Sequence, residues 1–160
     1  MGWWKSKKQQ PEIIWHVPEG RDDLVPQRAT KGSMAYDFVS PETITVPKYD
    51  PKLGVGSALI NLMLVATLPL GYGLVLRSRS GLANKEGLTV EAGEIDQDYL
   101  GLLRVLLFNH SGVDYTVNAG DRIAQARVVK IHKLKESVSY TYPDPDKTLR
   151  GSRGFGSTGK

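Results

Sequence analysis

Cysteine is absent from this 160-residue chain, and neither sign of charge dominates it. The missing thiols exclude disulfide scaffolds, zinc ribbons, redox dithiols and cysteine nucleophiles, and they are typical of a reducing, cytoplasmic compartment. The 21 Lys+Arg residues exceed the 17 Asp+Glu residues by only +4, which is too little to predict a nucleic-acid-binding protein. The length supports one domain with a hydrophobic core.

An uncharged stretch of 24 residues runs from Leu53 to Leu76 and has the length of a membrane-spanning helix. Glycines, an asparagine and a proline interrupt it, however, and Pro69 with Gly71 predicts a turn between two strands. We therefore expect β-strands here and no membrane contact. The first residues match M-G-x-x-x-[ST] through Gly2 and Ser6, so a lipid-attached chain stays open as an alternative.

Short apolar runs separated by turn residues make up most of the sequence, and they predict an all-β sandwich, jelly roll or barrel. A helix is expected only near Leu82–Glu86. After Tyr142, two prolines cannot join a central strand because they lack the backbone donor, so a mobile arm should follow. The runs expected to form strands are Ile13–Val17, Thr43–Val46, Ala58–Leu68, Gly73–Arg77, Leu102–Asn109, Tyr115–Val117, Ile123–Ile131 and Val138–Tyr142.

Four of the chain's 17 glycines lie between Gly151 and Gly159, inside this expected arm. The arm matches G-x-G-x-x-G and G-x-x-x-x-G-K, but both phosphate motifs need a helix after the loop, and none can follow before Lys160. Backbone amides, hydroxyls and arginines there could still cradle an anion, while Phe155 could stack on a base. A disordered tail is the alternative.

Asp96 and Asp98 would project from one face of an extended strand, opposite Ile95 and Gln97. A carboxylate held near a polyphosphate could accept a proton from an attacking water. The alternative is an aspartate-rich hairpin turn. The three histidines are far apart and lack metal-ligand spacing, so no protein metal cluster is expected.

Two further segments combine arginine with small or polar residues. Arg77-Ser78-Arg79-Ser80-Gly81 is either an anion site at the start of the short helix or a capped turn with solvated arginines. Gly120-Asp121-Arg122-Ile123-Ala124-Gln125 is expected to be a turn entering a strand, with Ile123 and Gln125 on one face and Arg122 and Ala124 on the other.

Taken in order, five segments resemble the motifs of the trimeric dUTP diphosphatase (dUTPase) family, from about Val25 to the C-terminus. They are Ala35-Tyr36-Asp37; Arg79-Ser80-Gly81-Leu82-Ala83; Gly93 to Gly101 with Leu107-Phe108-Asn109; Gly120 to Gln125; and Arg150 to Gly159. Five motifs in order are far more specific than any one alone.

The resemblance implies a distorted β jelly roll assembled as a homotrimer, in which each active site combines parts of three subunits. It divides this chain into an N-terminal extension of unknown role (1–24), a dUTPase-like β domain (25–142) and a glycine-rich arm (143–160) that closes over a neighbour's site. The implied reaction is hydrolysis of dUTP to dUMP and pyrophosphate by water attack on the α-phosphorus. It keeps uracil out of DNA and supplies dUMP for dTMP synthesis.

The resemblance also implies a role for individual residues. Asp96 would be the catalytic base, Tyr99 would pack under the deoxyribose, and backbone groups near Ala92 and Gly93 would read the uracil, with Ile95 beside them. The residues implied to bind phosphates are Arg79, Ser80, Gly81 and Gln125, joined from the arm by Arg150, Gly156, Ser157 and Thr158, while Phe155 would cover the uracil. Asp37, Asp98 and Asp121 would support the site, and Mg²⁺ would be held by the triphosphate and water rather than by protein ligands.

The sequence departs from the family in places. Met34-Ala35 precedes the Tyr-Asp pair, where glycine is usual, and Arg153 stands where a small residue is usual. Two other readings stay open. One is a dCTP deaminase, or a bifunctional deaminase and diphosphatase, on the same fold. The other is a regulatory binding protein switched by nucleotide. We expect a cytoplasmic protein without nucleic-acid partners.

Overall fold

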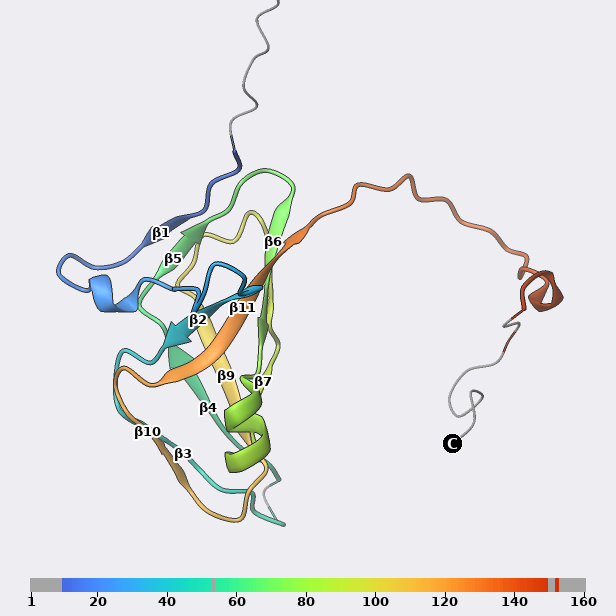
Figure 1. The fold of residues 1–160 in the computed structure, drawn as a ribbon. Coiled ribbons are helices and arrows are strands. Elements are labelled where there is room, and N and C mark those ends of the chain that lie inside the picture. The colour runs from blue at the N-terminus through green and yellow to red at the C-terminus, as the bar shows by residue number, and fades with distance from the viewer. Residues whose placement is uncertain (1–9, 53, 150–151, 153–160) are drawn as a thin grey trace, which may run out of the picture.

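Antiparallel β-strands dominate the computed structural model, which describes residues 10–52, 54–149 and 152 (Figure 1). Three short helical turns accompany them: η1 (Asp22–Leu24), η2 (Leu82–Glu86) and η3 (Pro145–Lys147). The strands are β1 (Ile14–His16), β2 (Ala35–Val39), β3 (Ile44–Val46), β4 (Gly56–Asn61), β5 (Val65–Thr67), β6 (Tyr72–Arg77), β7 (Leu88–Glu91), β8 (Glu94–Ile95), β9 (Arg104–Asn109), β10 (Tyr115–Val117) and β11 (Arg122–Lys130). The all-β prediction and the helix near Leu82–Glu86 are confirmed.

Two larger sheets enclose the core. One has the strand order β2-β11-β6-β8 and the other β4-β9-β7. Two-stranded pairs close the ends: β1 with β5 at one end and β3 with β10 at the other (Figure 1). Beyond β11, residues 131–149 leave the sheets as an exposed segment that contains η3 near its end.

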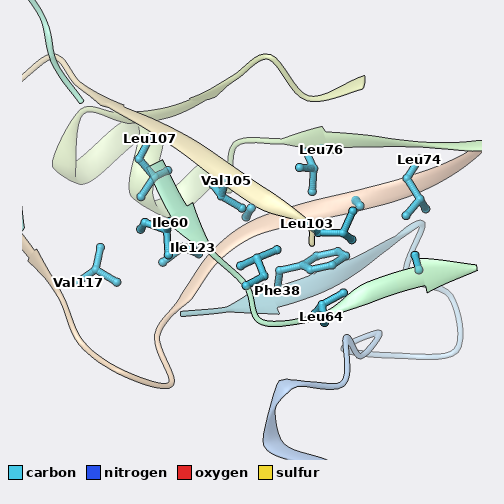
Figure 2. Close-up of a cluster of buried hydrophobic side chains, with 14 of the residues drawn as sticks. Phe38, Ile60, Leu64, Leu74, Leu76, Leu103, Val105, Leu107, Val117 and Ile123 are labelled. Carbon is cyan, nitrogen blue, oxygen red and sulfur yellow. The ribbon is translucent and has the colours of Figure 1, made fainter. Parts of the chain in front are cut away.

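Alternation of side chains along the strands builds this core. On β9, Val105 and Leu107 are buried, while Leu106 and Phe108 point to the other face and are only half-buried, as the two-residue period of a strand requires. Phe38 lies at the centre, only 1% exposed (Figure 2). The larger side chains packed with it include Ile60, Leu62, Leu74, Leu103, Leu107 and Ile123.

Strand β1 lies within segment 1–24, the extension to which the sequence assigned no role. It pairs with β5, Trp15 lying opposite Ala66. The Trp15 ring meets Tyr36 and Phe38 edge-on, with ring centroids 5.6 and 5.8 Å apart, a favoured geometry for aromatic pairs. This part of the extension therefore helps to close the core beside β2.

Most expected strands are found, but their number and limits differ. The run Ala58–Leu68 is two strands, β4 and β5, separated at Met63, whose positive φ of 55° interrupts the extended backbone. The prediction of a strand at Val138–Tyr142 is wrong: the segment is exposed and pairs with no described strand. An extended segment becomes a strand only when its backbone N–H and C=O groups pair with a neighbouring strand, and this segment has no such neighbour among the described residues.

The apolar runs did not predict three of the described strands: β2, β7 and β8. The turn predicted at Pro69 is confirmed, since the Tyr72 amide donates to the Pro69 carbonyl oxygen at 3.2 Å between β5 and β6. Within the described ranges, no helix is long and apolar enough to cross a membrane.

Candidate active site

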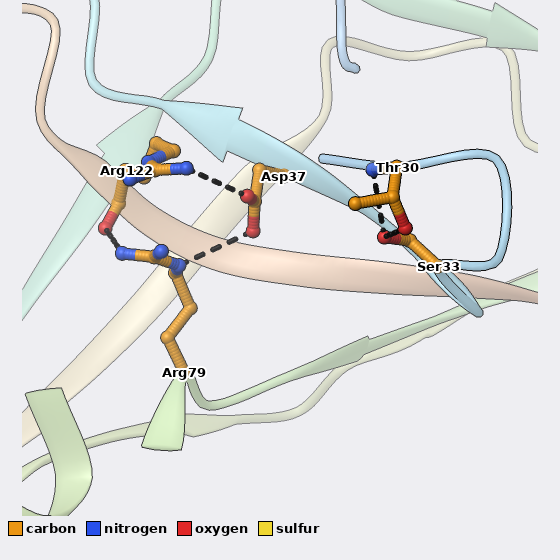
Figure 3. Close-up of polar contacts among 5 residues, drawn as sticks. All are labelled: Thr30, Ser33, Asp37, Arg79 and Arg122. Carbon is orange, nitrogen blue, oxygen red and sulfur yellow. Dashed lines mark hydrogen bonds and ion pairs between the residues drawn. The ribbon is translucent and has the colours of Figure 1, made fainter. Parts of the chain in front are cut away.

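Asp37 on β2 carries a carboxylate held by two arginines (Figure 3). Arg79 Nε donates to Oδ1 at 3.2 Å, and Arg122 Nη1 donates to Oδ2 at 3.3 Å. Arg79 Nη1 also donates to the Arg122 carbonyl oxygen at 3.0 Å. The Asp37 side chain is only 18% exposed, and a largely buried carboxylate requires such partners to offset its lost hydration.

A β-bulge in β11 brings Arg122 to this carboxylate. Gln125 lies opposite Asp37, and the register shifts between Arg122 and Ala124. Ile123 and Ala124 are consecutive and both buried, whereas Gln125 faces outward. The prediction that Ile123 and Gln125 share a face is therefore wrong, because the extra residue of a bulge resets the alternation.

Gln125 is anchored in the middle of the outer sheet face. It lies between Asp37 on β2 and Arg77 on β6, and its Nε2 donates to the Ser78 carbonyl oxygen at 2.9 Å. Ser80 and Gly81 follow Arg79 and are exposed at the start of η2, where no side chain caps the helix. The side-chain cap of the capped-turn alternative is therefore not found, while Arg77 is exposed, as that alternative expected.

Asp121 shapes the turn that precedes β11. Its Oδ2 accepts the Asn118 backbone amide at 2.8 Å and the Asn118 side-chain amide at 3.3 Å. Nearby, a cavity of about 270 Å³ is lined by Arg79, Arg122 and Tyr115, among others. Burial raises the pKa of the Tyr115 hydroxyl above its ordinary value, and the negative charges of Glu86 and Asp121 raise it further.

A second cavity, of about 340 Å³, brings together four residues that the sequence predicted. They are Ala92, Ile95, Asp96 and Tyr99. The remaining lining residues were not predicted from the sequence to belong to a binding site: Leu59, Glu94, Arg104 and Leu106. Arg104 and Leu106 are two residues apart on β9, so the two-residue period of a strand predicts that they lie on the same face.

The β7–β8 connection forms one wall of this cavity by packing tightly on β6. The Leu76 amide donates to the Gly93 carbonyl oxygen at 2.7 Å. A Cβ added at Gly93 would lie 2.4 Å from the Leu76 carbonyl oxygen, so only glycine permits this approach. Ala92 beside it has a positive φ of 51°, and both residues are thereby fixed relative to the sheet.

Asp96 begins a turn rather than continuing a strand. The Tyr99 amide donates to the Asp96 carbonyl oxygen at 3.2 Å, and Gln97 and Asp98 form the turn. The extended arrangement of Asp96 and Asp98 is therefore wrong, and the aspartate-rich turn is confirmed. Asp98 is exposed and does not line the cavity, whereas Asp96 does.

Tyr99 folds back over the chain that follows it. Its hydroxyl donates to the Leu102 carbonyl oxygen at 2.9 Å. Gly101 allows this, since a Cβ there would lie 2.6 Å from the Tyr99 hydroxyl oxygen. The Tyr99 ring is therefore held in place by the hydrogen bond of its hydroxyl, and it fits there because Gly101 has no side chain.

Asn109, at the end of β9, has a fully buried side chain. Its Nδ2 donates to the carbonyl oxygens of Val46 and Val113 at 3.2 and 2.9 Å. Its Oδ1 accepts from the backbone amide and the hydroxyl of Ser111. Asn109 is thus a structural residue that ties β3 to the turn after β9.

The structure assembles two separate clusters from the predicted residues. Asp37, Arg79 and Gln125 belong to one, and Ala92, Ile95, Asp96 and Tyr99 to the other. Five predicted residues lie outside the described residues: Arg150, Phe155, Gly156, Ser157 and Thr158. Among the side chains the structure describes, no three His, Cys, Asp or Glu residues gather as metal ligands.

Comparison with known proteins identifies relatives along nearly the whole chain. The dUTPase family model matches residues 22–159. A deoxyuridine 5'-triphosphate nucleotidohydrolase of Candida albicans is 38% identical over 155 residues, covering 95% of this chain and 89% of that protein. One of Solanum lycopersicum is 44% identical over 137 residues, covering 85% of this chain and 75% of that protein.

Solved structures share the fold. The dUTPase of Staphylococcus bacteriophage 80alpha with dUpNHpp superposes with a TM-score of 0.77 at 24% identity, covering 93% of this chain and 99% of that one. A dUTPase of phage phi11 of S. aureus, described with a structural Mg(II) ion, gives 0.69 at 23% identity, covering 82% and 98%. The distorted jelly-roll prediction is confirmed by these superpositions.

Proposed function

Because this chain belongs to the dUTPase family, we propose that its two clusters hold opposite ends of one dUTP molecule during hydrolysis. The chain is a dUTP diphosphatase, which converts dUTP to dUMP and pyrophosphate. The observation that carries the assignment of residues is the cavity in which Asp96 and Tyr99 lie together with Ala92 and Ile95.

The nucleoside end fits this cavity. Its lining combines apolar side chains, which suit a base and a sugar, with the Asp96 carboxylate at one side. Backbone groups of Ala92 and Gly93 read the uracil, because their positions are fixed by packing on β6. Tyr99 packs under the deoxyribose, and Asp96 accepts a proton from the water that attacks the α-phosphorus.

The phosphate end fits the arginine cluster. Arg79 offers a guanidinium whose direction is set by Asp37 and by the Arg122 carbonyl oxygen, so it meets phosphate oxygens without first reorganising. Ser80, Gly81 and Gln125 complete this end. The arm residues Arg150, Gly156, Ser157 and Thr158 close on the terminal phosphate, and Phe155 covers the base.

Mg²⁺ fits this donor set as an ion that arrives with the substrate. Both Asp37 oxygens already accept arginine hydrogens, which leaves them able to accept from metal-bound water but poorly placed as direct ligands. The triphosphate and water would hold the ion. When bound, it neutralises phosphate charge.

We also propose a homotrimer with shared sites. Arg79 lines one cavity, Asp37 and Gln125 line another, and Asp96 and Tyr99 line a third, so a single nucleotide meets both clusters most simply across a subunit boundary. The mass in solution tests this proposal, and a monomer that is fully active would contradict it. A cytoplasmic location completes the proposal, and recovery of the chain only from an organelle or membrane fraction would contradict it.

A direct assay tests the function. We expect pyrophosphate release from dUTP with a kcat/KM at least about 10²-fold above that for dTTP, dCTP or UTP, since a pocket built on hydrogen bonds rejects mispaired bases. Ammonia should not be released from dCTP, and its release would establish the deaminase instead. A chain ending at Lys147 should keep its fold and lose most turnover; full turnover would remove the arm from the mechanism.

Substitution of Gly101 by alanine is expected to weaken discrimination against ribose. The added Cβ would displace the Tyr99 ring, so the ratio of kcat/KM for dUTP over UTP should fall about tenfold or more. The matched control is Gly112→Ala, where a Cβ meets nothing within 4 Å. If both variants keep the wild-type ratio, the fixed position of Tyr99 does not exclude ribose.

A further inference from the structure

Two arginines that the proposed mechanism leaves unused face a third cavity. Arg77 at the end of β6 and Arg127 on β11 line a space of about 450 Å³. Asp37 and Gln125 line it as well, and a wall is formed by Ala29, Ser33, Met34 and Ala35. Figure 3 shows that the loop with Thr30 and Ser33 leads into β2, the strand that carries Asp37.

The register places the two arginines side by side on the outer sheet face. Arg77 lies opposite Gln125, and Arg127, two residues after Gln125, lies opposite Val75, two residues before Arg77. Arg77 and Arg127 are therefore diagonal neighbours, with Cα atoms about 7–8 Å apart in a regular sheet. Like charges at this spacing repel each other unless an anion lies between them.

Among the residues that the structure describes, no carboxylate compensates this pair. Within residues 10–52, 54–149 and 152, neither guanidinium takes part in an ion pair, and Asp37 is the sole acidic residue among those lining the cavity. Both oxygens of Asp37 are engaged by Arg79 and Arg122. The cavity therefore presents two positive charges and no free negative one.

We propose that Arg77 and Arg127 form an anion subsite that continues the triphosphate site and binds the terminal phosphate of dUTP and the pyrophosphate product. The inference rests on the proposed function. Gln125 belongs to the proposed phosphate site and lines this cavity too, so a phosphate chain held there extends towards both guanidinium groups. Their planar forks match phosphate oxygens in a bidentate geometry.

Inorganic pyrophosphate is the probe that tests the subsite. Its affinity for the full-length chain is measured by calorimetry and by inhibition of dUTP hydrolysis. Arg77→Gln and Arg127→Gln should each weaken binding about three- to tenfold, and the double variant should lose the product of both factors, as expected for exposed charge-assisted contacts. Arg77→Lys and Arg127→Lys keep the charge but lose the fork, so they should lie between wild type and the Gln variants.

The control is Arg21→Gln, which removes one positive charge from a guanidinium paired with Asp23 and should leave pyrophosphate affinity unchanged. Equal affinity in wild type and the double Gln variant, with normal dUTP hydrolysis, would overturn the subsite and leave the proposed function standing. If wild type fails to hydrolyse dUTP but binds pyrophosphate through both arginines, the proposed function fails and the anion site stands. A loss shared by Arg21→Gln would reduce the effect to net charge and also overturn the subsite.

Discussion

The Asp96→Asn chain is expected to bind dUTP with nearly wild-type affinity while its turnover falls by about 10²- to 10⁴-fold, the range that a general base contributes. Asparagine keeps the shape of the side chain but has no lone pair basic enough to take a proton from water. Asp96 is exposed at the start of its turn, and the turn is closed by its backbone carbonyl. The substitution should therefore leave the fold intact.

Two measurements separate binding from chemistry in this variant. Pyrophosphate release at saturating dUTP gives kcat, and calorimetry gives the dissociation constant. Glu42→Gln is the matched control, since it neutralises an exposed carboxylate in the loop between β2 and β3, away from both clusters. Hydrolysis by Asp96→Asn at a near-normal rate would show that another group activates the water.

Removal of the Phe38 side chain should have the largest effect on stability. Phe38→Ala is expected to lower the free energy of unfolding by about 3–5 kcal/mol, because it removes a buried ring and leaves a cavity at the centre of the core. Urea denaturation measures the change. Trp15 would lose its edge-on contact with this ring, so the N-terminal strand β1 should loosen as well.

Leu134→Ala serves as the control for Phe38→Ala. Leu134 is 80% exposed in the segment that follows β11, and its loss should change the free energy of unfolding by no more than about 0.5 kcal/mol. A loss below about 1 kcal/mol for Phe38→Ala would mean that the core closes over the missing ring. Phe38 follows Asp37 directly, so dUTP affinity should fall in step with stability.

Much of the fold was predictable from local sequence patterns. Short apolar runs predicted most of the strands, and Pro69 predicted the turn between β5 and β6. Strand β2 escaped because its Tyr-Asp pair interrupts the apolar pattern, and β8 because it is only two residues long. The segment Val138–Tyr142 has the residue pattern of a strand, but a strand also needs a neighbouring strand to hydrogen-bond with, and the sequence pattern does not show whether one is present.

The candidate site depended more on contacts between distant segments. Its motifs were recognisable, and Asp96 and Tyr99 do lie in one cavity. The approach of Arg122 to Asp37 was not predictable, because the bulge that turns Arg122 outward is set by pairing with β2. Arg77 and Arg127 were missed because only strand register makes them neighbours.

The burial of Asn109 has a consequence for how the protein can be produced. Asn109-His110-Ser111 matches the N-glycosylation sequon, yet both hydrogens of the Asn109 amide are donated inside the protein. A glycan attached during secretion would occupy that nitrogen and hold the end of β9 open. When the protein is expressed through a glycosylating secretory route, every molecule glycosylated at Asn109 should therefore misfold. For the same reason, Asn109 cannot serve as a conjugation point on the folded protein.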